Sequence, residues 1–148
     1  GDSFSDQTIK LCREVFFSKD MMSDEMREKL MVASYLGGSA IATSYVGLVH
    51  PFSAGLSMVL GIHHCIANCI VMRAMEEFYP KYYNEFWKMV KTQNIYIPKG
   101  IANDLSEYKY KKLFSSTIIH EKPLYNALGE KFKEILNYEK VKSIFKKM

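Results

Sequence analysis

The chain has 148 residues, of which 48% are hydrophobic and 24% charged, and its formal net charge is +4. This length allows one domain with a sizeable core, and this balance excludes an intrinsically disordered chain. Three cysteines are too few and too irregularly spaced for a disulfide framework, so we expect a reducing, cytoplasmic location.

Two helices are predicted in the first third of the chain. Apolar side chains recur on one face with helical spacing over residues 4–16, and Ser3 is a candidate cap for this helix. The second helix is predicted to start after Ser23, which is followed by two acidic residues that the helix dipole favours. It should run to about Tyr45, and its many small residues suit close packing against another helix.

The next two predicted helices are placed by prolines. Proline is favoured in the first turn of a helix, so Pro51 predicts a helix that opens near His50. A further helix is predicted to begin at His63 or His64 and to continue until Pro80 ends it.

The remainder of the chain also has helical patterns. No alternating strand pattern, internal repeat or glycine-rich phosphate loop occurs in the sequence. We therefore predict an all-α helical bundle that forms one domain over residues 1–148. Its last elements are an amphipathic helix at 82–93, a connection at 94–103 and short helices at 106–116, 124–136 and 138–147.

Charge and hydropathy raise two alternatives. Residues 81–148 hold fourteen basic and seven acidic side chains, against six and nine in residues 1–80, which suggests a nucleic-acid-binding half. The lysines, however, alternate with glutamates at helical spacing, as on a solvated helix face. The apolar stretch from Val46 to Met75 contains three histidines and an arginine, which favours buried helices over a membrane span. We expect neither nucleic acid nor membrane as a partner.

His50 and His64 lie fourteen residues apart in apolar surroundings. Imidazole binds Fe(II) and Zn(II), and a catalytic site needs three or four such ligands plus an open position. Spacing leaves two interpretations open, a shared metal ion or a pair of hydrogen-bonded core histidines. Fourteen residues of straight helix span about 21 Å. A shared metal therefore requires the chain to leave the helix between Gly55 and Gly61 and fold back before His64.

Other polar side chains near this stretch have simpler interpretations. Cys65 and Cys69, one helical turn apart, suggest a zinc site, but structural thiols are far commoner in an apolar helix. His63 should point away from its neighbour at position 64, and His120 is expected to be a surface loop residue. Asn68 could contact a metal ligand or simply bond to backbone.

The residues from Gly47 to Asn68 follow a recognisable pattern: Gly-x-x-His, a second His fourteen residues after the first, and Ala-Asn soon after that. This segment resembles the iron-containing (group III) alcohol dehydrogenases. The resemblance covers most of residues 1–80 and is looser beyond them. It implies that the chain is the all-helical, metal-binding C-terminal domain of this fold, related to dehydroquinate synthase. It also implies that His50 and His64 are two of the metal ligands.

In that family an Asp and a His one helical turn apart complete the ligand set, and the first twenty residues here contain no histidine. We therefore expect a fragment, inactive by itself, of a protein more than twice as long. The resemblance implies a metal-dependent alcohol dehydrogenase that transfers a hydride from a polar primary alcohol to NAD or NADP. Its cofactors would be Fe(II) or Zn(II), and a nucleotide bound mainly by the absent domain.

Two departures from the family pattern concern the substrate. Ala54 stands where many members carry another histidine, and His64 lies between His63 and Cys65 instead of between proline and glycine. Both features resemble the subgroup that oxidises the terminal alcohol of 3-deoxy-manno-octulosonate, a carboxylated sugar. The expected partner is thus a small-molecule alcohol, and a homodimer is the assembly we consider. The rival function is an all-α protein-interaction module whose histidines are structural.

Overall fold

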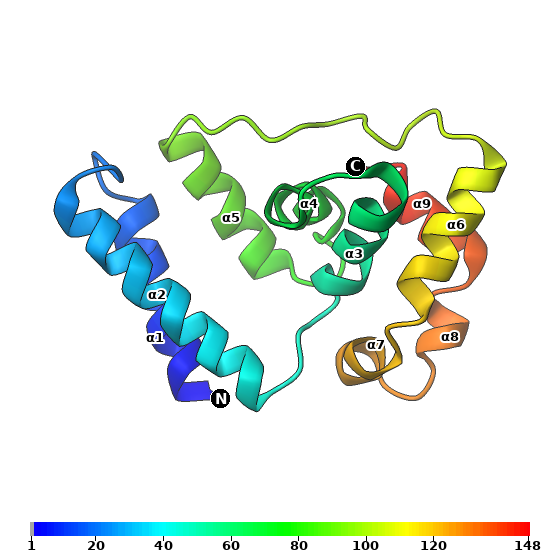
Figure 1. Ribbon diagram of the computed structural model, residues 1–148, viewed down its shortest axis with the longest axis horizontal. Helices are drawn as coiled ribbons and strands as arrows, with labels where there is room; N and C mark the ends of the chain where they lie inside the picture. Colours follow the sequence, from blue (N-terminus) through cyan, green and yellow to red (C-terminus); the bar gives the residue numbers. More distant parts are fainter. Residues whose placement is uncertain (1) are drawn as a thin grey trace. The chain divides into compact units, whose positions relative to one another are not determined.

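The computed structural model describes residues 2–148, which form helices and no strand, as the sequence predicts (Figure 1). Within these residues no helix is both long and apolar enough to span a bilayer. The chain divides into two compact units, unit 1 (Gly1–Tyr45 and Asn84–Tyr96) and unit 2 (Val46–Tyr83 and Ile97–Met148). The elements are α1 (Asp2–Phe16), α2 (Asp24–Thr43), α3 (Val49–Leu60), α4 (His64–Val71), the 3-10 helix η1 (Met72–Ala74), α5 (Pro80–Thr92), α6 (Glu107–Ile118), α7 (Glu121–Leu128), α8 (Phe132–Ile135) and α9 (Tyr138–Phe145).

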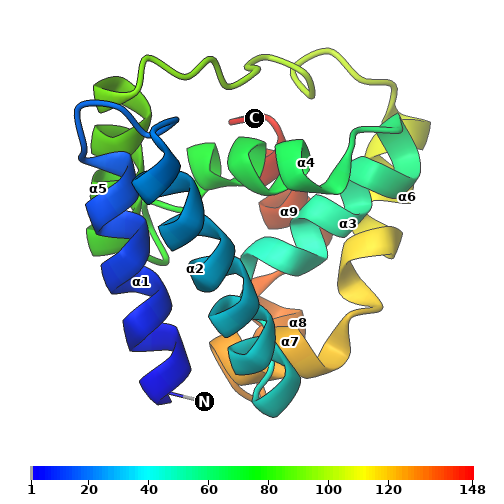
Figure 2. The ribbon, with the colours of Figure 1, turned by 60° about the vertical axis from the view of Figure 1, so that its left-hand side comes forward.

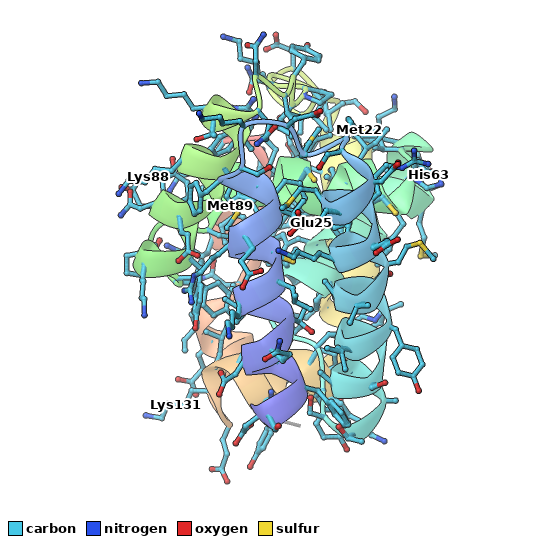
Figure 3. All side chains as sticks on the ribbon, turned by 90° about the vertical axis from the view of Figure 1, so that its left-hand side faces the viewer. Met22, Glu25, His63, Lys88, Met89 and Lys131 are labelled. Atoms are coloured by element: carbon cyan, nitrogen blue, oxygen red, sulfur yellow. The ribbon has the colours of Figure 1, made fainter. Side chains whose placement is uncertain are left out.

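In unit 1, α1 and α2 lie side by side and antiparallel (Figure 2). The Ser23 hydroxyl accepts a hydrogen bond from the Met26 N–H, so it caps α2 as predicted. Ser3 lies inside α1, which begins at Asp2, and does not act as the predicted cap. Glu25 lies near the start of α2 (Figure 3), where Lys29 pairs with it and with Glu14 of α1, which links the two helices.

The part of α5 that belongs to unit 1 is fastened to α1 by polar contacts. Arg13 pairs with Glu85, and the Gln93 side-chain amide donates to the carbonyls of Phe16 at 3.0 Å and Ser18 at 2.9 Å. These bonds satisfy carbonyl groups at the C-terminal end of α1 that have no partner within the helix.

Pro80 begins α5 instead of ending the preceding helix. Proline cannot continue a helix, but its fixed φ angle and missing N–H suit the first helical position. Its chemistry is therefore compatible with the end of one helix and with the start of the next. The predicted helix from His64 to the residue before Pro80 ends as α4 at Val71 and continues only as η1. Ala74, the last residue of η1, and Met75 directly after it are buried, so tertiary packing overrides the local helix propensity here.

In unit 2, α3 packs against α4 and α6. Phe52 of α3 is fully buried, and its ring centroid lies 5.2 Å from that of Phe145 on α9. A Cβ on Gly55 would lie 3.0 Å from the Thr117 hydroxyl oxygen and 3.5 Å from the Leu113 carbonyl oxygen. The absence of a side chain at Gly55 thus allows α6 to approach the backbone of α3 closely.

The C-terminal segments match the prediction in part. The helix predicted at 124–136 is split into α7 and α8, because Gly129 adopts a φ of 77° that ends α7. The connection predicted at 94–103 is confirmed as non-helical. Within unit 2, Arg73 fixes part of this connection by donating hydrogen bonds to the carbonyls of Ile97 at 2.6 Å and Pro98 at 2.8 Å.

Glu107, in the first turn of α6, links this helix to α9. Its carboxylate accepts hydrogen bonds from Lys142 and from the Tyr138 hydroxyl, and these bonds lower the pKa of Glu107 below its ordinary value of 4.5. A carboxyl group whose pKa is lower in the folded state stabilises the fold above its unfolded pKa and loses this contribution as the pH falls.

We therefore expect Glu107→Gln to lower the melting temperature slightly at pH 7, with a difference from the wild type that shrinks below pH 4.5. Thermal melts followed by circular dichroism between pH 7 and pH 3 measure this. The control is Glu130→Gln, the same substitution at an exposed carboxylate. A difference that stays constant over this range would contradict the assignment.

Candidate metal centre

His50 lies in the first turn of α3, where Pro51 is also found, as the sequence predicts. The entry into this helix is held in place by Tyr79, whose hydroxyl oxygen accepts a hydrogen bond from the Leu48 N–H at 3.1 Å. Leu48 is fully buried, so the backbone just before His50 has little freedom. The Ser53 hydroxyl donates a hydrogen bond to the His50 carbonyl at 3.0 Å. This bond involves only the backbone of His50 and not its imidazole ring.

The turn between the two candidate ligands is made by Gly61. It ends α3 with a φ of 69° and a ψ of 20°, a left-handed conformation that favours glycine, and α4 begins at His64. The predicted exit from the helix is thereby confirmed, at the later of the two glycines, while Gly55 stays inside α3. The ring centroids of His50 and His64 lie 5.2 Å apart with an angle of 77° between the rings.

His120 is a third member of this cluster. Its ring centroid lies 5.5 Å from that of His50, again with an angle of 77°. The residue is half-buried at the N-cap of α7, and its Nε2 atom is buried without a hydrogen-bond partner in the described structure. The sequence predicts a surface loop residue here. His120 does lie in the connection between α6 and α7, but it is half-buried against His50, because α6 packs on α3.

The surroundings of His50 favour its neutral form. Burial lowers the pKa of His50, and the proximity of His64 and then of His120 lowers this pKa further. A protonated imidazole has no lone pair to offer a metal, so a lowered pKa keeps the ligating form populated at neutral pH.

The ring separation of His50 and His64 fits both interpretations left open by the sequence, a metal ligand pair and two imidazoles packed edge to face. Two imidazoles on one tetrahedral metal, with metal–nitrogen bonds of ~2.0–2.1 Å, place their ring centroids about 5 Å apart. The observed 5.2 Å agrees with this value. Within residues 2–148, however, no group of three or more His, Cys, Asp and Glu side chains has an arrangement that could hold a metal ion. The two predicted ligands thus meet, but they do not form a complete site in this conformation.

The neighbouring candidates lie outside the pair. His63 is exposed just before α4, as Figure 3 shows, and Cys65 is exposed as well. Burial raises the pKa of the Cys69 thiol, and the nearby Cys65 adds to this shift. A raised pKa disfavours the thiolate form that zinc requires, which supports a packing role for Cys69. Asn68 is half-buried on α4, one turn after His64.

A comparison of the sequence with models of known protein families finds no match. The resemblance to iron-containing alcohol dehydrogenases rests on the motif from Gly47 to His50, on His64 and on Ala67-Asn68. Membership of that family stays a prediction.

Proposed function

We propose that this chain is the metal-binding helical part of a metal-dependent, NAD(P)-linked alcohol dehydrogenase, in which His50 and His64 are two ligands of Fe(II) or Zn(II). One observation carries the proposal: the Gly61 turn brings two histidines fourteen residues apart to a ring separation of 5.2 Å. The resemblance supplies the reaction class, with a polar primary alcohol, of the carboxylated-sugar kind, as the substrate.

The two histidines would contribute differently to such a site. When bound, the metal would supply a Lewis acid that lowers the pKa of the substrate hydroxyl. His50 is half-buried in the first turn of α3, and its lowered pKa favours the neutral form that can offer a lone pair to a metal. His64 is exposed at the start of α4, which leaves that side of the pair accessible to a substrate. The remaining ligands and the nucleotide-binding half would come from the residues before this chain.

The test uses a protein that carries this chain together with its nucleotide-binding half. We expect it to reduce NAD or NADP with a polar primary alcohol, to lose this activity on treatment with a chelator, and to regain it with Fe(II) or Zn(II). Mg²⁺ is the control, because it prefers oxygen ligands and should not restore activity. Unchanged turnover after elemental analysis has shown the metal to be removed would refute the proposal.

The rival function, an all-α protein-interaction module, is favoured by one feature of unit 1. The side chains of Met31 and Tyr35, one turn apart on α2, are 72% and 75% exposed. Exposed apolar side chains of this size are found at protein-interaction surfaces, although single ones are also common on ordinary surfaces. A metal-independent protein would leave this function as the remaining candidate.

A further inference from the structure

We propose that a groove in unit 2 binds a small phosphate monoester, a phosphorylated molecule whose uncharged part is apolar or aromatic. The groove lies between the C-terminal end of α3 and one face of α6, and its lining includes Met58, Val59, Tyr108, Lys111, Lys112 and Ser116. Along α3, Met58 comes eight residues after His50, a rise of about 12 Å. This α3–α6 groove is thus separate from the candidate metal centre, and the inference does not depend on the proposed function.

The size of the α3–α6 groove suits a small molecule. Its volume is about 540 Å³, within the ~300–1,000 Å³ that is usual for small-molecule sites. Both walls belong to unit 2, where α3 and α6 pack directly on each other (Figures 1 and 2). The fully buried Leu113 and Thr117 of α6 lie against Gly55 of α3 and fix the separation of the two helices. The groove is therefore formed by two helices held at a constant distance.

The charge of the groove points to a phosphate group. Lys111 and Lys112 are exposed and form no ion pair within the described residues. Glu107, the acidic residue of α6, is already bound by Lys142 and Tyr138, and none of the described lining residues is acidic. A phosphate monoester carries a charge of about −1.5 to −2 at pH 7, which matches two lysines.

The type of cation also favours phosphate over carboxylate. Lysine binds phosphate as a point charge, whereas the flat carboxylate group is recognised best by the planar fork of arginine. No arginine is among the described residues that line the groove. We therefore assign the two ammonium groups to a tetrahedral anion.

Two further side chains of α6 position the polar end of the ligand. The Lys112 Nζ atom lies 4.8 Å from the centroid of the Tyr108 ring, and this cation–π contact restrains the ammonium group beside the groove. Ser116 lies one helical turn after Lys112, and its hydroxyl has no hydrogen-bond partner among the described residues, so it is free to donate to a phosphate oxygen. Ser115 also lines the groove, but its hydroxyl already donates to the Lys111 carbonyl at 3.0 Å.

The α3 wall of the groove is apolar. Met58 is 68% exposed and Val59 is half-buried. A methionine side chain is flexible and adapts to the shape of a bound apolar or aromatic group. We therefore expect the uncharged part of the ligand to cover Met58, so that an organic phosphate binds more tightly than inorganic phosphate.

The test is isothermal titration calorimetry of the full 148-residue chain with AMP, adenosine and adenosine-5′-carboxylic acid. We expect one AMP per chain, with roughly tenfold weaker binding of the other two compounds, because each lacks the doubly charged phosphate. Lys111→Gln and Lys112→Gln should each weaken AMP binding about threefold or more. The matched control is Lys109→Gln, which removes the same charge from an exposed side chain of α6 outside the groove and should leave the affinity unchanged. Circular dichroism verifies that each variant is folded.

The controls separate the α3–α6 groove from a general attraction to basic surface. Equal losses in Lys109→Gln and Lys111→Gln would overturn the inference, because the phosphate would then respond to overall charge. Equal affinities for AMP and adenosine-5′-carboxylic acid would overturn the assignment to phosphate. An oligouridylate that binds more tightly than AMP, with equal sensitivity to all three lysines, would show a nucleic-acid surface instead. Absence of binding of both AMP and inorganic phosphate at millimolar concentration would also overturn the inference.

Discussion

Replacing Phe52 with alanine is expected to reduce the free energy of unfolding by about 3–5 kcal/mol, because it removes a fully buried ring and leaves a cavity. The ring packs against Phe145, with the centroids 5.2 Å apart, and so joins α3 to the C-terminal helix α9. Single domains are stable by only about 5–15 kcal/mol. A loss of this size would therefore unfold much of unit 2 on mild heating and displace the helix that carries His50.

Urea denaturation followed by circular dichroism measures this loss. The matched control is Phe4→Ala, the same substitution at a side chain of α1 that is 41% exposed. It removes less buried surface and leaves no closed cavity, so we expect a change of no more than about 1 kcal/mol. Equal losses in the two variants would show that Phe52 is not a core residue.

Helix starts were predictable wherever the chemistry is local. Ser23 caps α2 with its own side chain, and Pro51 lies in the first turn of α3, so a few neighbouring residues determine each start. The same holds for the turn at Gly61, where the left-handed conformation requires a residue without a side chain. The meeting of His50 and His64 follows from that turn, and for this reason the sequence could predict it.

Features that depend on tertiary contacts could not be predicted in this way. Pro80 can either end a helix or begin one, and the local sequence does not decide between the two; in the structure it begins α5. His120 is seventy residues from His50 in the sequence, and no local pattern relates them. They meet because α6 packs closely on α3 at Gly55, a contact between distant segments that the spacing of residues does not encode.

In the protein that includes the nucleotide-binding half, His50→Ala and His64→Ala are each expected to lower kcat by roughly a thousandfold or more. Lewis-acid stabilisation by the metal lowers the activation barrier by several kcal/mol, and every ~1.4 kcal/mol corresponds to a factor of ten in rate. Each substitution removes one of the two imidazoles whose rings lie 5.2 Å apart, so the metal would be lost or displaced. Steady-state kinetics with the alcohol and NAD(P), alongside metal content for each variant, measure the effect.

The control for this prediction is His63→Ala, which removes an exposed imidazole next to His64 and should leave kcat within a few-fold of the wild type. Both ligand variants should keep the melting temperature of the metal-free wild type within a few degrees, because neither candidate ligand is fully buried. A low kcat combined with intact folding then reports on chemistry instead of stability. A His50→Ala, His64→Ala double variant with full activity would exclude these residues from catalysis, and the interaction-module function would remain.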